Sequence, residues 1–155
     1  MKRLRARDLR RLRFPAALAA GALVLAGCSN YSGGHSQQVA QWVSGSQLSA
    51  NDGYVVADLR DIEDGISAGN LAATHTACDG LATDAATAYG ELPTPDASLT
   101  ADLDTAYLAY IRAAEDCSSA GSFSSPGFHR YRGAVANGTR ALDAARRRLR
   151  DLGAG

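Results

Sequence analysis

Apolar residues recur in alternating steps of four and three along two long segments of this sequence, and that spacing restricts the fold more than any other feature. A period near 3.6 places such residues on one face of an α-helix. Strand-type alternation is absent and alanine is abundant, so we predict an all-α domain. The two stripes are Leu99, Leu103, Ala106, Tyr110, Ala113 and Cys117 in residues 97–119, and Phe128, Tyr131, Val135, Gly138, Leu142, Ala145, Leu149 and Leu152 in residues 126–152.

Three further helical segments are expected before these two. The first, residues 37–44, is short. The second covers residues 52–67, and the third begins after Asn70, a residue suited to cap a helix, and ends at the proline-containing stretch ELPTPD. Together the segments predict an antiparallel bundle of about four main helices over residues 37–152, with the short first helix as an added arm. The expected apolar positions are Val39, Trp42 and Val43; Val55, Leu59, Ile62 and Ile66; and Leu71, His75, Cys78, Leu81 or Ala82, Ala85 and Tyr89.

The N-terminus has the order of a secretory signal: seven basic residues before position 14, an apolar run over residues 14–25, then small residues. The apolar run is shorter than the roughly 20 residues that span a bilayer. Its last residues, Leu25-Ala26-Gly27-Cys28, resemble a bacterial lipobox. The resemblance implies a signal peptide over residues 1–27, a fatty-acylated (palmitate-type) diacylglyceryl group on Cys28, and anchoring at the extracytoplasmic face of the cell membrane. An ordinary signal peptide with a chance cysteine stays open, as does the choice between general and twin-arginine export.

Residues 28–36, CSNYSGGHS, are small and polar and are expected to form a flexible linker. Seven of the 16 basic and one of the 16 acidic residues fall within residues 1–27, so the remaining chain holds 9 basic and 15 acidic residues. That acidic balance argues against a nucleic-acid partner. The basic residues concentrate in the last segment, where they either pair internally with acidic helices, which we favour, or contact anionic lipid.

Two cysteines remain besides Cys28, and both lie on predicted apolar stripes. A bond between Cys78 and Cys117 would close a loop of about 40 residues, worth roughly 4 kcal/mol in the chain-entropy model. Two buried free thiols are the alternative; a metal site is disfavoured because no second histidine or cysteine stands at ligand spacing. The stretches ACDGLATD, LPTPD and AAEDC resemble a group of exported actinobacterial proteins of unknown function. The resemblance, over most of residues 37–150, supports the bundle and the disulfide and supplies no catalytic residue.

Candidate chemical groups are sparse. His75 lies on an apolar face, where a packing role is more frequent than catalysis. Serine-rich SSAGSFSSPG lacks a nucleophile elbow. The sequence therefore assigns no catalytic, cofactor-binding or metal-binding residue. An acidic cluster could supply paired carboxylates but more often forms a solvated surface; it comprises Asp58, Asp61, Glu63 and Asp64.

From these observations we expect a non-enzymatic binding module tethered to the membrane, with an envelope protein or a small ligand as its partner. The alternative is a cell-envelope enzyme, either a hydrolase or a metal-dependent activity, that uses His75 with nearby carboxylates. An open cleft that brings His75 and carboxylates together would favour the enzyme, and a filled core would favour the binding module.

Overall fold

The computed structural model describes residues 33–155, which form five helices: α1 (His35–Gly45), α2 (Leu48–Ser67), α3 (Leu71–Tyr89), α4 (Ala97–Ser118) and α5 (Pro126–Asp151). These residues contain no strand. The predicted signal peptide over residues 1–27, Cys28 and residues 29–32 of the predicted linker lie outside the described residues. Helix α1 begins at His35, so the last residues expected in the linker belong to a helix instead.

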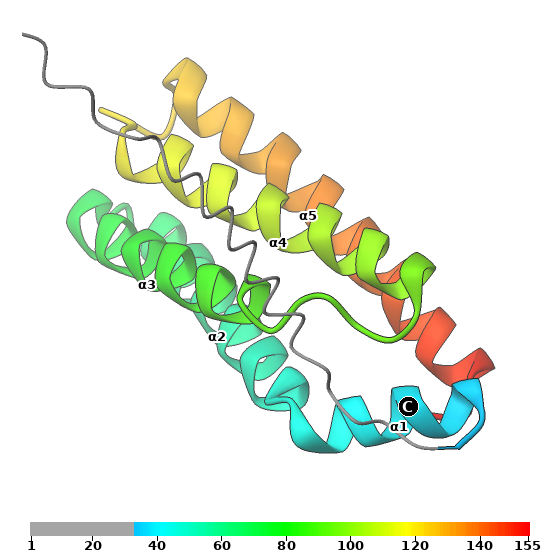
Figure 1. The fold of residues 1–155 in the computed structure, drawn as a ribbon. Coiled ribbons are helices and arrows are strands. Elements are labelled where there is room, and N and C mark those ends of the chain that lie inside the picture. Colours follow the sequence, from blue (N-terminus) through cyan, green and yellow to red (C-terminus); the bar gives the residue numbers. More distant parts are fainter. Residues whose placement is uncertain (1–32) are drawn as a thin grey trace, which may run out of the picture.

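The four long helices pack in chain order, α2 against α3, α3 against α4 and α4 against α5 (Figure 1). Successive helices run in opposite directions, and the short helix α1 lies across the end of the bundle where α5 terminates. The predicted all-α, antiparallel bundle with a short N-terminal helix is therefore confirmed. None of the described helices combines the length and apolarity needed to cross a bilayer.

The predicted stripes match the core closely in α4 and less closely in α3. All six positions predicted for α4 are buried. In α3 the buried stripe passes through Thr74 and Ala88, whereas the predicted Tyr89 is 38% exposed and Leu71 is only partly buried. Thr74 can be buried because its hydroxyl donates to the backbone carbonyl of Asn70, 2.9 Å away. A polar residue whose hydroxyl is hydrogen-bonded within its own helix region thus occupies a core position that an apolar pattern does not predict.

Local signals explain where the helices begin and end. Asn70 caps α3 as predicted, because its side chain accepts a hydrogen bond from the backbone N–H of Ala73. Gly69, at φ 64°, takes the left-handed conformation that ends α2. Asp96 and Ser125 cap α4 and α5 through side-chain oxygens, and Pro126 occupies the first position of α5.

Helices α4 and α5 approach closely at Gly138. A Cβ atom at that position would lie 2.8 Å from Cε1 of Tyr110, inside van der Waals contact. Tyr110 is 1% exposed, so its ring has no room to withdraw. The glycine on the α5 stripe therefore makes space for an aromatic side chain.

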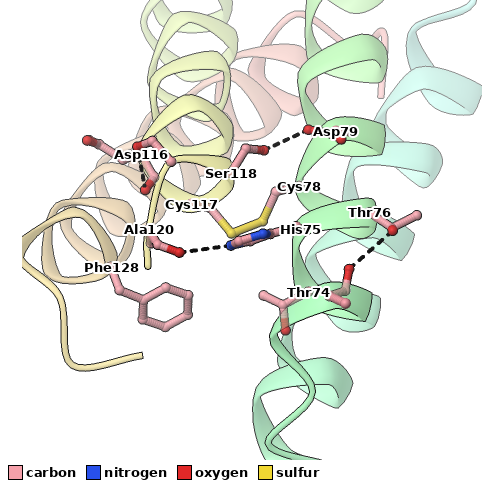
Figure 2. The surroundings of a disulfide bond; sticks show 12 residues. Thr74, His75, Thr76, Cys78, Asp79, Asp116, Cys117, Ser118, Ala120 and Phe128 are labelled. Carbon is pink, nitrogen blue, oxygen red and sulfur yellow. Dashed lines mark hydrogen bonds between the residues drawn. A yellow bond between two sulfur atoms is a disulfide. The ribbon is translucent and has the colours of Figure 1, made fainter. Parts of the chain in front are cut away.

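The predicted disulfide joins Cys78 to Cys117, with 6.1 Å between the Cα atoms (Figure 2). Both cysteines are fully buried. Cys78 lies in the middle of α3 and Cys117 in the last turn of α4, so the two helices are staggered. Residues 90–96 cover the offset as an extended connection beside the bundle (Figure 1).

Candidate functional site

The His75 side chain makes a structural hydrogen bond. Its Nε2–H donates to the backbone carbonyl of Ala120, 3.0 Å away, and its ring lies beside the disulfide (Figure 2). Asp79, one turn further along α3, accepts a hydrogen bond from Ser118 at 2.7 Å. Both contacts tie α3 to the end of α4. The structure therefore gives the acid–base role considered for His75 no supporting geometry.

The acidic cluster is divided between two surfaces. Asp58, Asp61 and Asp64 line an open hollow of about 780 Å³ between α2 and α3. Glu63 lies on another surface, near Arg132 of α5. Within residues 33–155 no group of three or more histidine, cysteine, aspartate or glutamate side chains is arranged to hold a metal ion. The paired carboxylates considered from the sequence form a surface and no described metal centre.

Asp58 is nevertheless unusual within that surface. Its Oδ2 atom is buried and has no hydrogen-bond partner. Burial, followed by the charge of Asp84 and a hydrogen bond to that side chain, raises the pKa of Asp58 to about 6; the charge of Asp61 adds to the effect. Asp58 is thus held in an environment that disfavours its ionised form.

A second acidic group lies at the opposite end of the bundle, which we call the α1 end: helix α1, the start of α2, the start of α4 and the end of α5. Asp96 is 3% exposed there. Arg148 of α5 donates to both its oxygens, through Nε at 3.2 Å and Nη2 at 2.8 Å. His35, the first residue of α1, contacts Oδ2 at 2.8 Å, and the backbone N–H of Leu99 donates to Oδ1 at 2.7 Å.

These partners stabilise the charged form of the carboxylate. The hydrogen bonds from Arg148, and then from the Leu99 backbone and His35, outweigh burial and hold the pKa of Asp96 well below its usual range. From sequence, His35 is predicted in the linker, and its contact with Asp96 is not foreseen. It joins residues 61 positions apart, and no local pattern reports such a pairing.

The same end carries a largely apolar concave surface, which we call the α1-end groove. It has a volume of about 550 Å³, within the usual 300–1,000 Å³ of ligand sites. Helices α1, α2 and α5 and the last residues of the chain form its walls. The lining residues are Val43, Leu48, Ser49, Asp52, Gly53, Val56, Arg146, Leu149, Ala154 and Gly155.

Two charged residues stand in this otherwise largely apolar lining. Asp52 accepts a hydrogen bond from the hydroxyl of the buried Tyr107 at 3.0 Å, and its other oxygen lies 3.5 Å from Nη2 of Arg146. The second Arg146 contact, to Asp143, is 3.6 Å long. Burial raises the pKa of Asp52, although the hydrogen bond from Tyr107 and the charge of Arg146 act in the opposite direction. Asp52 and Arg146 are 94 residues apart, and sequence reasoning identified neither as a site residue.

Two of the basic residues at the end of α5 pair with the protein's own carboxylates. Arg148 pairs with Asp96, and Arg146 lies between Asp52 and Asp143. Arg147 and Arg150 are exposed. The internal pairing that the sequence analysis favoured is therefore present for two of these arginines.

Comparison with known proteins finds no relative: no protein-family model, no curated protein and no solved structure matches the chain. The class of protein that the structure defines is a disulfide-linked helical bundle. Its function has to be argued from its own residues.

Proposed function

We propose that this protein is a lipid-anchored, extracytoplasmic binding module without catalytic activity. The observation that carries the proposal is the α1-end groove, because a largely apolar concavity with a few convergent polar groups is the usual form of a binding site. The lipobox-like sequence ending at Cys28 supplies the anchoring part of the proposal.

The position of the groove fits a tethered protein. Residues 29–34 separate Cys28 from α1, and six extended residues span at most about 20 Å. Helix α1 lies at the same end of the bundle as the groove, since Val43 is part of the lining. A lipid on Cys28 would therefore hold the groove within a short distance of the membrane surface and concentrate it there.

No specific observation favours the enzymatic alternative. His75 is bonded to a backbone carbonyl, and the carboxylates at the α1 end are bonded to Arg148, His35, Tyr107 or Arg146. In none of these sets does a base face a nucleophile as catalysis would require.

The anchor is tested by fractionating cells that express the full chain. The unsubstituted protein is expected in the membrane fraction with lipid incorporated, and Cys28→Ala is expected to lose both. Incorporation of labelled lipid and normal processing in Cys28→Ala would contradict the anchoring.

The binding role is tested with a photo-crosslinking amino acid at one of two exposed positions in the same cells. Ser49 lines the groove, whereas Gly133 lies on an exposed part of α5 away from it. We expect an adduct from position 49 and none from position 133. Equal labelling at both positions, or none at either, would contradict a binding role for the groove.

A further inference from the structure

We infer that the α1-end groove binds a primary ammonium ligand with an apolar body, with Asp52 receiving the ammonium group. This inference rests on the proposed binding function and specifies the ligand chemistry of the same groove. Two independent features of the lining carry it: the apolar walls and the charge arrangement around Asp52.

The walls fix the apolar part of the ligand. Leu48 and Leu149 are 7% and 8% exposed, so each leaves only an edge of its side chain open to the groove. Val43, Val56 and Ala154 complete the apolar surface. A ligand of about six carbons would cover these edges, and removal of its apolar surface from water would favour binding.

The charges favour a cation over an anion. Arg146 lies between two carboxylates, Asp52 at 3.5 Å and Asp143 at 3.6 Å, so its charge is already opposed on both sides. The three groups together carry one net negative charge. Asp143 lies outside the lining, so an incoming cation would meet the Asp52 carboxylate, whereas an incoming anion would meet an Arg146 guanidinium whose charge two carboxylates already oppose.

Asp52 also has unused hydrogen-bonding capacity. Its side chain is 16% exposed, and its one hydrogen bond of normal length comes from Tyr107. The contact to Arg146 is long, and the arginine side chain is 41% exposed, which leaves it free to turn toward Asp143. An ammonium group could then donate a charge-assisted hydrogen bond to the second Asp52 oxygen.

The full chain itself offers a reporter for this inference. Trp42 is its single tryptophan, is 4% exposed and precedes Val43 of the groove lining. Titration of Trp42 fluorescence with hexylammonium is therefore the primary measurement, with amide chemical shifts of Ser49 and Gly53 as a second. Hexanol and hexanoate serve as probes with the same apolar body and a neutral or negative head group.

Hexylammonium is expected to bind at least about tenfold more tightly than hexanol, and hexanoate more weakly than either. In Asp52→Asn, which keeps an oxygen to accept from Tyr107, hexylammonium affinity should fall about tenfold, to that of hexanol. Tighter binding of hexanoate, or unchanged hexylammonium affinity in Asp52→Asn, would overturn the inference.

A groove-filling variant checks where the probe binds. Gly53 is part of the lining and a Cβ atom there meets nothing within 4 Å, so Gly53→Leu adds a side chain at the groove without a clash at its Cβ. Gly133, in α5, has equally open surroundings and lies away from the groove, so Gly133→Leu is the matched control. We expect Gly53→Leu to lose hexylammonium binding and Gly133→Leu to keep it. Equal loss in both variants, or unchanged binding in both, would overturn the inference.

Failure of this inference is distinguishable from failure of the proposed function. If no probe binds saturably while the crosslinker at position 49 still gives an adduct in cells, the ligand chemistry is wrong and the binding role stands. If both measurements are negative, the proposed function is wrong as well.

Discussion

The two ends of this bundle are stabilised by different kinds of interaction. At the disulfide end, the Cys78–Cys117 bond is fully buried and is followed by packed aromatic rings, with Phe123 and Phe128 centroids 5.2 Å apart. At the α1 end, the buried Asp96 joins three helices through charge-assisted hydrogen bonds. The first end is closed by a covalent bond and apolar contacts, with hydrogen bonds such as Ser118 to Asp79 beside them. The second combines apolar packing of Val39 and Trp42 with a hydrogen-bond network centred on one buried carboxylate.

This difference is consistent with the position of the groove at the α1 end. A covalent crosslink fixes helix positions whatever fills the space between them, but it offers a ligand no polar group. Charged contacts fix the helices while leaving donors and acceptors near the surface, as at Asp52 and Arg146. We therefore expect the disulfide end to govern stability and the α1 end to govern binding and the response to pH.

The largest expected effect is loss of the disulfide. In the double variant Cys78→Ala/Cys117→Ala, the free energy of unfolding should fall by about 4 kcal/mol, because the unfolded chain is no longer restrained by the crosslink. Denaturant titration measures this. Asp79→Ala, which removes only the exposed contact to Ser118, is the control and should cost less than about 1 kcal/mol. A loss below 1 kcal/mol in the double variant would show that the disulfide end does not dominate stability.

Removal of the Asp96 carboxylate should rank second. Asp96→Ala deletes the α4 cap and leaves Arg148 without its partner, at an expected cost of about 3 kcal/mol. Asp96→Asn keeps a capping oxygen and should cost about half as much. His35→Ala, which removes one half-exposed partner, should cost below 1 kcal/mol. If Asp96→Ala and His35→Ala lower the free energy of unfolding by the same amount, the Asp96 carboxylate is not the main stabilising group of the α1 end.

The same carboxylate predicts sensitivity to acid. Because its partners hold the pKa of Asp96 well below the unfolded value of about 3.9, its stabilisation is fully present above that pH and is lost as the pH falls below it. Unfolding free energy measured from about pH 5 to pH 2.5 should therefore drop more steeply in the unsubstituted protein than in Asp96→Asn. Parallel curves would assign the acid sensitivity to other groups.

The disulfide end was also the more predictable of the two from sequence. Cys78, Cys117 and the α4 stripe follow from spacing along single helices, and the structure confirms them. The contacts of the α1 end join residues 52, 61 and 94 positions apart. Helical periodicity places a residue on a face of its own helix but does not say which residue of another helix it meets. His35 is predicted in a linker because its neighbours are small and polar, and Asp52 escapes recognition because its partners lie on other helices.

A smaller effect of opposite sign is expected at Asp58, on the α2–α3 surface. Its pKa is raised to about 6, so the folded state binds its proton more tightly than the unfolded state and this group lowers stability at higher pH. Asp58→Asn should stabilise the protein by about 1 kcal/mol near pH 8, after allowance for solvent screening, and by nothing near pH 4. Thermal unfolding at both pH values checks this, with Glu115→Gln, at an exposed position of α4, as control. Destabilisation at pH 8 would show that the ionised carboxylate has a structural role.

The smallest effect is expected at the membrane itself. Exposed arginines near anionic lipid add about 1 kcal/mol each, but Arg146 and Arg148 are engaged with Asp52, Asp143 and Asp96. That leaves Arg147 and Arg150 exposed at this end of α5, too few for stable attachment without a lipid.

We therefore expect the full chain carrying Cys28→Ala to bind vesicles containing phosphatidylserine weakly or not at all at physiological salt, as measured by flotation. Arg147→Gln/Arg150→Gln should change that result little. Salt-sensitive flotation that disappears in this double variant would mean that the α1 end holds the membrane through its own charges. The groove would then have to be regarded as part of a membrane-contact surface, because Arg146 lines it and precedes Arg147 in α5.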